Sequence, residues 1–428
     1  MPGSINTSNL LAGAPMSHGA FGNTTNEFSS ANMNTVLAEI EKTQSFTMDW
    51  GTKVANVEHY GRALGLSSSD DWTQAVRNAI ADTTKTLIYL PGFYQVTGPI
   101  YLPFHKILVS DRGYYTWTGG LVRNGASGQH LLQIGGGHGV ANVSLRSEDN
   151  SAGSVVLFKY DITQEPVDLP GRIHSDWWGD GSEYLDENSD GFFVNNYLAG
   201  SGMIVRSGIQ GWHMSGSTFD VTGTGNIWVD SANGGFMSNN HLLGNRFFGS
   251  GGTYNLKLER FNANLLDGNV IDYGTNGIGI HLSNSIGNVW GTNQIQGCVV
   301  GMQIDNCGTD SANYNDFGNM IVLHTQSQKL IVNNSKNQLF NSFTCGKSSV
   351  GSIEQYGLTS DGSAQIQTNG TCERIVFGRV ALATGIGVNG LVLGSGTTKS
   401  GATVLLANGV ASPFVNGGGV TNFADRVL

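Results

Sequence analysis

The sequence has few charged residues, few prolines and few cysteines. Charged residues make up 13% of its 428 residues, about half of the usual share of about 25%. Eight prolines are too few for collagen or for a proline-rich linker. Because 22 Lys and Arg face 32 Asp and Glu, the net charge is −10, and the chain lacks the basic surface that nucleic acid requires. These shortages exclude a low-complexity linker and a nucleic-acid-binding protein.

Signals for membranes, disulfides, metals and cofactors are also missing. No apolar run approaches the roughly 18 residues of a membrane span, and the N-terminus lacks the basic-then-apolar layout of a secretion signal. The four cysteines form no CxxC pair and are too few for a disulfide framework, so we expect free thiols made in a reducing cytosol. HExxH, GxSxG and Walker sequences are absent. We therefore expect no membrane insertion, no metal and no cofactor.

Glycine and asparagine fill the places that charges usually occupy. Glycine takes 62 positions, about double its usual share. These residues are poor in helix interiors but tolerate the positive φ angles of tight turns. Since hydrophobic residues still reach 39%, the chain can build a sizeable core. The composition therefore favours short strands joined by tight turns over an ordinary helical enzyme.

An asparagine recurs at a nearly fixed period over about 190–345. Asn245, Asn269, Asn293, Asn319 and Asn341 follow one another at steps of 24, 24, 26 and 22 residues, each next to apolar residues. A fixed period with a strand–turn pattern indicates a solenoid, whose turns stack to share one core. We expect the asparagines to form a ladder in which side-chain amides bond from turn to turn.

A distinct module precedes these repeats. It comprises an apolar segment at 54–61, a helix that Asp70 or Asp71 caps, and strands at 87–90, 93–96 and 100–102. We expect the first segment to be a strand. The buried stripe of the helix is predicted to consist of Trp72, Ala75, Val76, Ala79 and Ile80.

This order resembles the N-terminal module of pectate-lyase-like right-handed parallel β-helix proteins. That module reads V-x-x-[FY]-G, then an Asp-Asp-Thr-x-Ala helix, then [IV]-x-[LF]-P-x-G-x-Y, and it matches 57–61, 70–75 and 88–94 here. Two departures are Gly92 directly after Pro91, and Trp72 in place of the threonine. The resemblance implies an all-β fold, a right-handed single-stranded parallel β-helix with a short N-terminal helix and a β-rich C-terminal cap.

Phage tailspikes and polysaccharide depolymerases commonly carry this module without a secretion signal. The resemblance therefore implies a homotrimer in the virion, on the phage tail, that acts outside the cell at the host surface. A secreted microbial enzyme of the pectinase type is the alternative. The expected domains are an N-terminal segment with one helix (1–50), the N-terminal module (51–120), the β-helix body (121–345) and a β-rich cap or oligomerisation region (346–428).

Alternation along five repeated strands predicts which side chains face outward. Four residue pairs should point inward: Met203/Val205, Ile227/Val229, Leu256/Leu258 and Ile280/Leu282. The residues between them form a first outward column of Ile204, Trp228, Lys257, His281 and Asp305. A second outward column contains Arg206, Asp230, Glu259, Ser283 and Cys307, and its alignment assumes an insertion near 250–253.

Asp230 and Glu259 are neighbours in the second column, since parallel strands lie about 4.8 Å apart. Glycoside hydrolysis needs such a pair, one carboxyl to protonate the leaving oxygen and one carboxylate to attack the sugar or activate water. Trp228 beside them can stack on a sugar ring. The alternative is a surface ladder of salt bridges with Arg206 and Lys257.

A second chemistry is open to the same face. A lyase that acts on a uronic acid needs a base for the C5 proton and cations for the carboxylate. His281 and Lys257, with Arg206 or Arg260, could supply these groups, and Asp305 next to His281 completes the candidate catalytic set. The alternative for His281 is an exposed polar position without a catalytic role.

A loop at 174–190 is dense in acids and aromatics. Trp177 and Trp178 are candidates for a sugar platform. The acids from Asp176 to Glu187 resemble a calcium loop, but Trp178 and Tyr184 occupy ligand places. A solvated loop packed on the solenoid is the simpler interpretation.

The sequence thus predicts a tailspike-like depolymerase that binds and cleaves a bacterial surface polysaccharide, capsule or O-antigen, by acid–base glycoside hydrolysis. A long flat face of stacked turns suits an extended polymer. The alternatives are a polysaccharide lyase and a receptor-binding or adhesion protein without catalysis.

Overall fold

The structure is a computed structural model. It describes residues 53–103, 105–111, 117–123, 129–135, 139–147, 155–159, 187–189, 191–221, 225–249, 252–272, 277–308, 314–323, 325, 327–345, 365–382, 389–407, 410, 412–418 and 421–427. The helix expected around Met33 to Ile40, the candidate platform of Trp177 and Trp178, and the calcium-like loop lie outside these residues.

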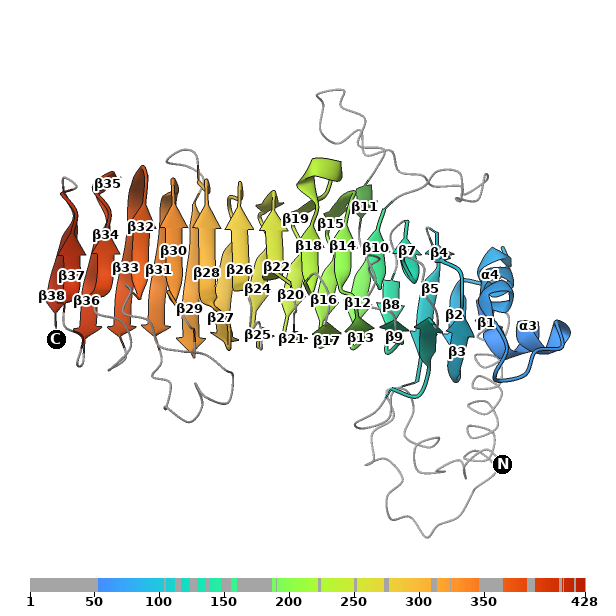
Figure 1. Ribbon diagram of the computed structural model, residues 1–428. Coiled ribbons are helices and arrows are strands. Elements are labelled where there is room, and N and C mark those ends of the chain that lie inside the picture. The colour runs from blue at the N-terminus through green and yellow to red at the C-terminus, as the bar shows by residue number, and fades with distance from the viewer. Residues whose placement is uncertain are drawn as a thin grey trace, which may run out of the picture.

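The described residues form a parallel β-solenoid. Figure 1 shows the strands side by side along one axis, with the earliest turns at one end and the C-terminus at the other. All of the strand pairs have parallel register, such as Ile227 with Leu256 and Leu256 with Ile280. The predicted all-β parallel solenoid is therefore confirmed, and the predicted register across the long step from 227 to 256 is correct.

One of the three sheets in the described part of the chain has twelve strands. From the N-terminal end these are β4 (Ile100–Leu102), β7 (Leu132–Ile134), β10 (Val156–Phe158), β14 (Met203–Val205), β18 (Ile227–Val229), β22 (Tyr254–Glu259), β26 (Ile278–Ser283), β28 (Val300–Asp305), β30 (Leu330–Asn333), β32 (Ile366–Asn369), β34 (Asn389–Leu393) and β37 (Ser412–Asn416). We refer to this as the twelve-stranded sheet.

The other two sheets complete the turns. A short sheet contains β11 (Glu187–Ser189), β15 (Gly208–Gln210), β19 (Phe236–Ser238) and β23 (Phe261–Asn262). The largest sheet contains β1 (Val54–Asn56), β2 (Leu87–Leu90), β3 (Phe93–Val96), β5 (Ile107–Ser110), β6 (Gly120–Arg123), β8 (Gly139–Ala141), β9 (Ser144–Ser147), β12 (Phe192–Val194), β13 (Tyr197–Gly200), β16 (His213–Ser215), β17 (Thr218–Val221), β20 (His241–Leu243), β21 (Arg246–Phe248), β24 (Leu265–Asp267), β25 (Val270–Ile271), β27 (Val289–Gln296), β29 (Asn315–Leu323), β31 (Lys336–Cys345), β33 (Cys372–Leu382), β35 (Thr397–Thr398), β36 (Gly401–Ala407) and β38 (Phe423–Val427).

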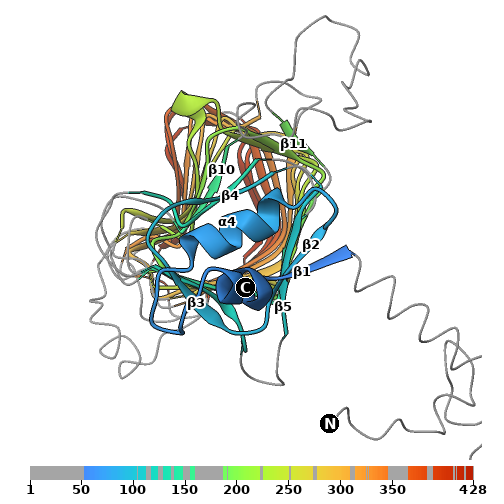
Figure 2. The same cartoon turned by 90° about the vertical axis from the view of Figure 1, so that its right-hand side faces the viewer.

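Helix α4 (Thr73–Ala81) covers the N-terminal end of the solenoid (Figure 2). Asp71 begins it, because its Oδ1 accepts the Thr73 amide N–H at 2.9 Å. The predicted helix stripe is confirmed, since all five of its side chains are buried. An end of a solenoid exposes strand edges and an open core, and this helix closes one of them.

The expected strand over 54–61 is wrong beyond its first residues. Only β1 is extended, and helix α3 (Val57–Ala63) follows it. The Asn56 side chain accepts the Glu58 amide N–H at 3.0 Å and so caps this helix. Val57 and Gly61 are the buried residues, at a helical spacing of four. A side chain at Gly61 would collide with the Trp72 ring, whose atoms lie 2.0 Å from an added Cβ.

The core runs along the axis of the solenoid. The inward pairs predicted on the twelve-stranded sheet are confirmed, with exposures of 0–1%. Aromatic rings continue from turn to turn, and Phe340 stacks on Phe317 and on Phe377 with centroids 4.4 and 4.7 Å apart. Such pairs add roughly 0.5–1.5 kcal/mol to the hydrophobic burial. All four cysteines are free and buried, as predicted for thiols outside a disulfide framework.

The asparagine ladder is confirmed for its first three members only. Asn245 Nδ2 donates to Asn269 Oδ1 at 3.1 Å, and Asn269 Nδ2 donates to Asn293 Oδ1 at 2.9 Å. The step of 26 residues then pairs Asn319 with Thr292, so that Met320 takes the inward place. Asn319 and Asn341 are therefore exposed, and their predicted place in the ladder is wrong. A shift of one residue in a strand reverses the face.

A second and longer ladder was not predicted. It consists of Asn240, Asn264, Asn288, Asn315 and Gln338, each of which donates from its side-chain amide to the next side-chain oxygen or accepts from the previous one, at 2.9–3.2 Å. All five side chains are at most 1% exposed. Each donor and acceptor thus finds a partner inside the protein, as buried amides require.

The C-terminal region continues the solenoid. Strands β32, β34 and β37 extend the twelve-stranded sheet, and β33, β36 and β38 extend the largest one, all in parallel register. The described part of 346–428 is β-rich, as expected, but it adds turns to the body and does not form a separate layer.

Candidate functional site

The outer face of the twelve-stranded sheet carries the residues that the sequence singled out. Registers place Ile204, Trp228, Lys257 and His281 in one outward column, as predicted. The next member is Gln303, because His281 pairs with it after a step of 22 residues. Asp305 pairs with Ser283 and so lies in the second column with Glu259. Its predicted place in the first column is wrong, and Cys307, predicted to face outward, is buried.

Asp230 lies where β18 ends and the short 3-10 helix η2 (Ser231–Asn233) begins. Its Oδ2 accepts hydrogen bonds from Arg206 Nε at 3.0 Å and from Asn233 Nδ2 at 2.8 Å. The carboxylate is only 7% exposed. Asp230 was expected on an open face, but it is largely covered and is paired with Arg206.

Glu259 lies at the end of β22 and is more accessible. Its Oε2 accepts from Ser231 Oγ at 2.9 Å and lies 3.2 Å from Lys257 Nζ. Because Ser231 directly follows Asp230, the two carboxylates of the predicted pair are on adjacent turns, joined through this serine. Each carboxylate nonetheless has a cation of its own, as the salt-bridge alternative requires.

Lys257 is held between aromatic rings. Its Nζ lies 5.2 Å from the centroid of the Trp228 ring and 5.9 Å from that of Tyr254. Both contacts are within the range of a cation–π interaction. This arrangement fixes the lysine beside Glu259 and leaves Trp228 half-buried on the outer face. The structure therefore brings together Trp228, Lys257 and Glu259.

His281 and Asp305 form a close pair. His281 Nε2 lies 2.6 Å from Asp305 Oδ2, and the imidazole stacks on the Tyr254 ring at 4.8 Å. The exposed position considered for His281 is wrong, since the residue is 8% exposed.

Asp305 is stabilised in its ionised form. Gln303 and Asn333 donate to it at 2.7 and 2.6 Å, in addition to His281. Burial acts to raise the pKa of Asp305, but these three hydrogen bonds and the charge interaction with His281 outweigh it. The pKa therefore lies below its ordinary value of 3.8.

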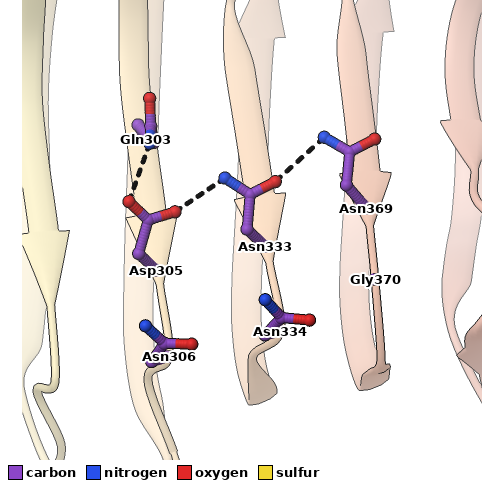
Figure 3. Close-up of a pocket in the computed structure, with 7 residues that line it drawn as sticks. All are labelled: Gln303, Asp305, Asn306, Asn333, Asn334, Asn369 and Gly370. Atoms are coloured by element: carbon purple, nitrogen blue, oxygen red, sulfur yellow. Dashed lines mark hydrogen bonds between the residues drawn. The ribbon is translucent and has the colours of Figure 1, made fainter.

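A groove of about 350 Å³ begins at Asp305 and runs toward the C-terminal turns. Figure 3 shows a row of hydrogen-bonded side chains across three strands, Gln303, Asp305, Asn333 and Asn369. Asn306, Asn334 and Gly370 line the groove one residue further along each strand. The groove is therefore lined almost entirely by carboxamides.

Sequence reasoning missed these amides. A usable signal was present, since Ile304-Asp-Asn-Cys307, Val332-Asn-Asn-Ser335 and Thr368-Asn-Gly-Thr371 are three copies of one strand end. The corner residues Asn306, Asn334 and Gly370 have φ of 53°, 47° and 66°. Asparagine and glycine are the residues that adopt this left-handed conformation most readily.

Two further observations limit the chemistry. Within the described ranges, no three His, Cys, Asp or Glu side chains are grouped so that they could hold a metal ion. The helices of that same part of the chain are all too short or too polar to span a membrane.

These features define a parallel β-helix with a polar outer face, and comparisons support this fold. No protein family matches the sequence, and no relative is found among curated proteins. Among solved structures, the enzymatically active domain of tailspike protein 2 from bacteriophage CBA120 is similar with a TM-score of 0.53 and 11% identity. The match covers 86% of this chain and 52% of that one, so the chain spans about half of the tailspike domain.

Two other solved structures are more distant. Tailspike protein 3 of bacteriophage CBA120 matches with a TM-score of 0.45 and 10% identity, over 90% of this chain and 62% of that one. The DFA-IIIase of Arthrobacter chlorophenolicus A6 matches with a TM-score of 0.47 and 9% identity, over 82% and 94%. At such identities the similarity establishes the solenoid fold, and the chemistry has to be argued from the residues of this chain.

Proposed function

We propose that the chain binds an extended bacterial surface polysaccharide, capsule or O-antigen, on the outer face of the twelve-stranded sheet and cleaves it by acid–base glycoside hydrolysis. One observation carries the proposal: Glu259 and Asp305 share an outward column, beside an aromatic residue and a groove of carboxamides. Polar groups that pair with hydroxyls, together with a ring that stacks on a sugar, are what carbohydrate binding needs.

Glu259 is the proposed proton donor and Asp305 the proposed base. Asp305 has three hydrogen-bond donors that favour its ionised form, which suits a group that activates water. Glu259 is accessible from the outer face, and a sugar that covers it removes water and thereby favours the protonated carboxyl. Ser283 separates the two residues, so their Cα atoms are about two strand spacings, or about 10 Å, apart.

This spacing makes a prediction about stereochemistry. Inverting glycosidases hold their carboxyl groups roughly 6.5–9.5 Å apart, to leave room for a water molecule, whereas retaining enzymes hold them roughly 5–5.5 Å apart. The Glu259–Asp305 pair therefore predicts inversion. The pair expected from the sequence, Asp230 with Glu259 on adjacent turns, would instead predict retention. NMR of the first anomer released distinguishes the two pairs.

The remaining residues of the site have supporting roles in this proposal. Trp228 offers a ring for a sugar, and Lys257 and Arg206 fix the positions of Glu259 and Asp230. His281 orients Asp305 through the contact of 2.6 Å.

A lyase reaction is the second candidate, favoured by the proximity of a histidine–carboxylate pair and a lysine on one face. In that reaction His281 would take the C5 proton of a uronic acid and Lys257 would neutralise its carboxylate. Elimination leaves an unsaturated product that absorbs in the near ultraviolet, and hydrolysis does not. Release of reducing ends without new absorbance is the result expected here.

The test is incubation of the protein with purified capsule and O-antigen polysaccharides, followed by sizing of the chains. Shortened chains from the wild type and intact chains from Glu259→Gln are expected. A matched control is Glu373→Gln on β33, an acid of the largest sheet that pairs with Lys399 at 2.7 Å. Binding without shortening would instead support a receptor-binding or adhesion protein.

Assembly and location are part of the same proposal. A homotrimer on a phage tail, acting outside the host cell, is what the resemblance to tailspikes implies. Light scattering coupled to size-exclusion chromatography measures the mass in solution, and three times 45.4 kDa is expected.

A further inference from the structure

The groove beside Asp305 has an unusual distribution of charge. Of the seven residues that line it, Asp305 is the one with a charged side chain. Its Oδ2 accepts from His281 and Gln303, and its Oδ1 accepts from Asn333. The carboxylate is thus occupied by protein donors, and no Lys or Arg lines the groove. A negatively charged ligand would meet a carboxylate there and no compensating cation.

The rim of the groove offers free amide groups. Asn306 and Asn334 are exposed at successive corners. The Asn334 Oδ1 accepts the Thr371 amide N–H at 3.1 Å, which leaves its Nδ2 as a donor toward the groove. Within the described residues the Asn306 carboxamide makes no side-chain hydrogen bond. A carboxamide supplies both donors and acceptors, which match the hydroxyls and N-acetyl groups of uncharged sugars.

The third corner has no side chain for a steric reason. A Cβ atom at Gly370 would lie 2.1 Å from Asn334 Oδ1. The missing side chain therefore makes room for the Asn334 amide at the groove. Glycine at this corner also shows that the fold tolerates the loss of a side chain at these left-handed positions.

We infer that this groove holds one uncharged sugar unit of the polymer, a neutral or N-acetylated hexose, directly next to the bond that is cleaved. The inference rests on the proposed function, since Asp305 belongs both to the groove and to the proposed acid–base pair. A uronate is excluded from this position because its carboxylate would lie against Asp305 with no cation to offset the repulsion. Uronate units, where the polymer has them, lie elsewhere along the face.

The first experiment removes the free amides. The double variant Asn306→Gly and Asn334→Gly deletes both carboxamides, and glycine is at ease at their φ angles. A rise in KM of about fivefold or more is expected, with kcat within about twofold, since each lost hydrogen bond lowers affinity severalfold. The matched control is Asn239→Gly, an exposed corner asparagine with φ of 56° away from the groove, which should leave KM unchanged. An unchanged KM in the double variant would overturn the inference.

The second experiment identifies the sugar. Purified polysaccharides of known repeating unit serve as probes, half of them built from neutral and N-acetylated sugars and half containing a uronate. Mass spectrometry of the fragments gives the two units at each cleaved bond. An uncharged hexose on at least one side is expected for every polymer that is cleaved, and a uronate on both sides would contradict the inference.

The two proposals can fail separately. If the wild type cleaves none of the probes, hydrolysis is wrong, and titration of the same probes still tests the groove. Binding of uncharged polymers that the double glycine variant weakens then supports the inference, and equal binding by both proteins refutes it.

Discussion

The same residue type has two different roles inside and outside this solenoid. The inner ladder, from Asn240 to Gln338, is buried, and its amides bond to one another from turn to turn. The outer row of Asn333 and Asn369 follows the same axis, but it is half-exposed and adjoins a groove whose rim amides are free. Both rows arise from stacking turns in register. Burial and saturation of hydrogen bonds therefore distinguish an asparagine that holds turns together from one that can meet a ligand.

The difference is also one of charge. The described inner ladder contains only carboxamides, which lose little on burial once they are paired. The outer face adds Asp230, Glu259 and Asp305, whose charges water and hydrogen-bond donors stabilise. Variants inside should hence change stability and leave the chemistry alone, and variants outside should do the reverse.

The largest effect is expected for Glu259→Gln on the outer face. Loss of a general acid lowers turnover about 10²- to 10⁴-fold. Stability should change little, because Gln keeps the shape and can still bond to Ser231. Reducing-end release and thermal unfolding, measured on the same preparation, test both halves of the statement. Full activity in this variant would refute the proposed role, and Glu373→Gln controls for a change of charge alone.

The next largest effect is expected for Asn264→Ala in the inner ladder. The Asn264 Oδ1 accepts from both the backbone N–H and the Nδ2 of Asn240, at 2.9 and 3.0 Å. Both donors would be left buried and unpaired, at a cost of about 1–3 kcal/mol each. We expect unfolding free energy to fall by about 3 kcal/mol in urea denaturation. The exposed Asn341→Ala should lose less than about 0.5 kcal/mol, and equal losses would remove the distinction between inside and outside.

A smaller effect is expected for Trp228→Ala. The indole lies beside Lys257 on the outer face, and its loss removes a stacking surface for a sugar. KM should rise about threefold to thirtyfold, which corresponds to roughly 0.5–2 kcal/mol of apolar contact. Initial rates over a range of polymer concentrations measure it. A fall in kcat at unchanged KM would indicate that the ring positions Lys257 and Glu259 and does not bind sugar.

The smallest effect concerns pH and Asp305. Its pKa is lower in the folded protein than in the unfolded chain, so the unfolded state binds more protons. The contribution of Asp305 to stability is therefore fully present above its ordinary pKa of 3.8 and is lost as pH falls through the folded value. The stability difference between wild type and Asp305→Asn should shrink as pH is lowered from 7 to 3. A difference that stays constant over this range would contradict the assignment.

The fold could be predicted from the sequence because its signals are local and repeated. The period near 24 and the inward pairs such as Leu256 and Leu258 are visible in the chain itself. The helix at 57–63 was missed because Asn56 and Gly61 act through contacts, a cap and the Trp72 ring, that alternation does not reveal. The ladder failed after Asn293 because one step is longer by two residues.

The site was only half predictable for a related reason. Register from 203 to 283 was correct, and it placed Trp228, Lys257 and Glu259 together. A step of 22 residues where 24 was assumed put Asp305 in the wrong column, so its position across Ser283 from Glu259 was not foreseen. Sequence also does not reveal which carboxylate is covered, and Asp230 proved to be the buried one.

A structure of Glu259→Gln with a bound fragment of the polymer tests the central claim most directly. The proposal predicts a sugar chain along the outer face of the twelve-stranded sheet, with the scissile oxygen at the side chain of residue 259 and an uncharged hexose in the groove beside Asp305. A chain bound to the largest sheet, or one that does not contact residue 259, would contradict it.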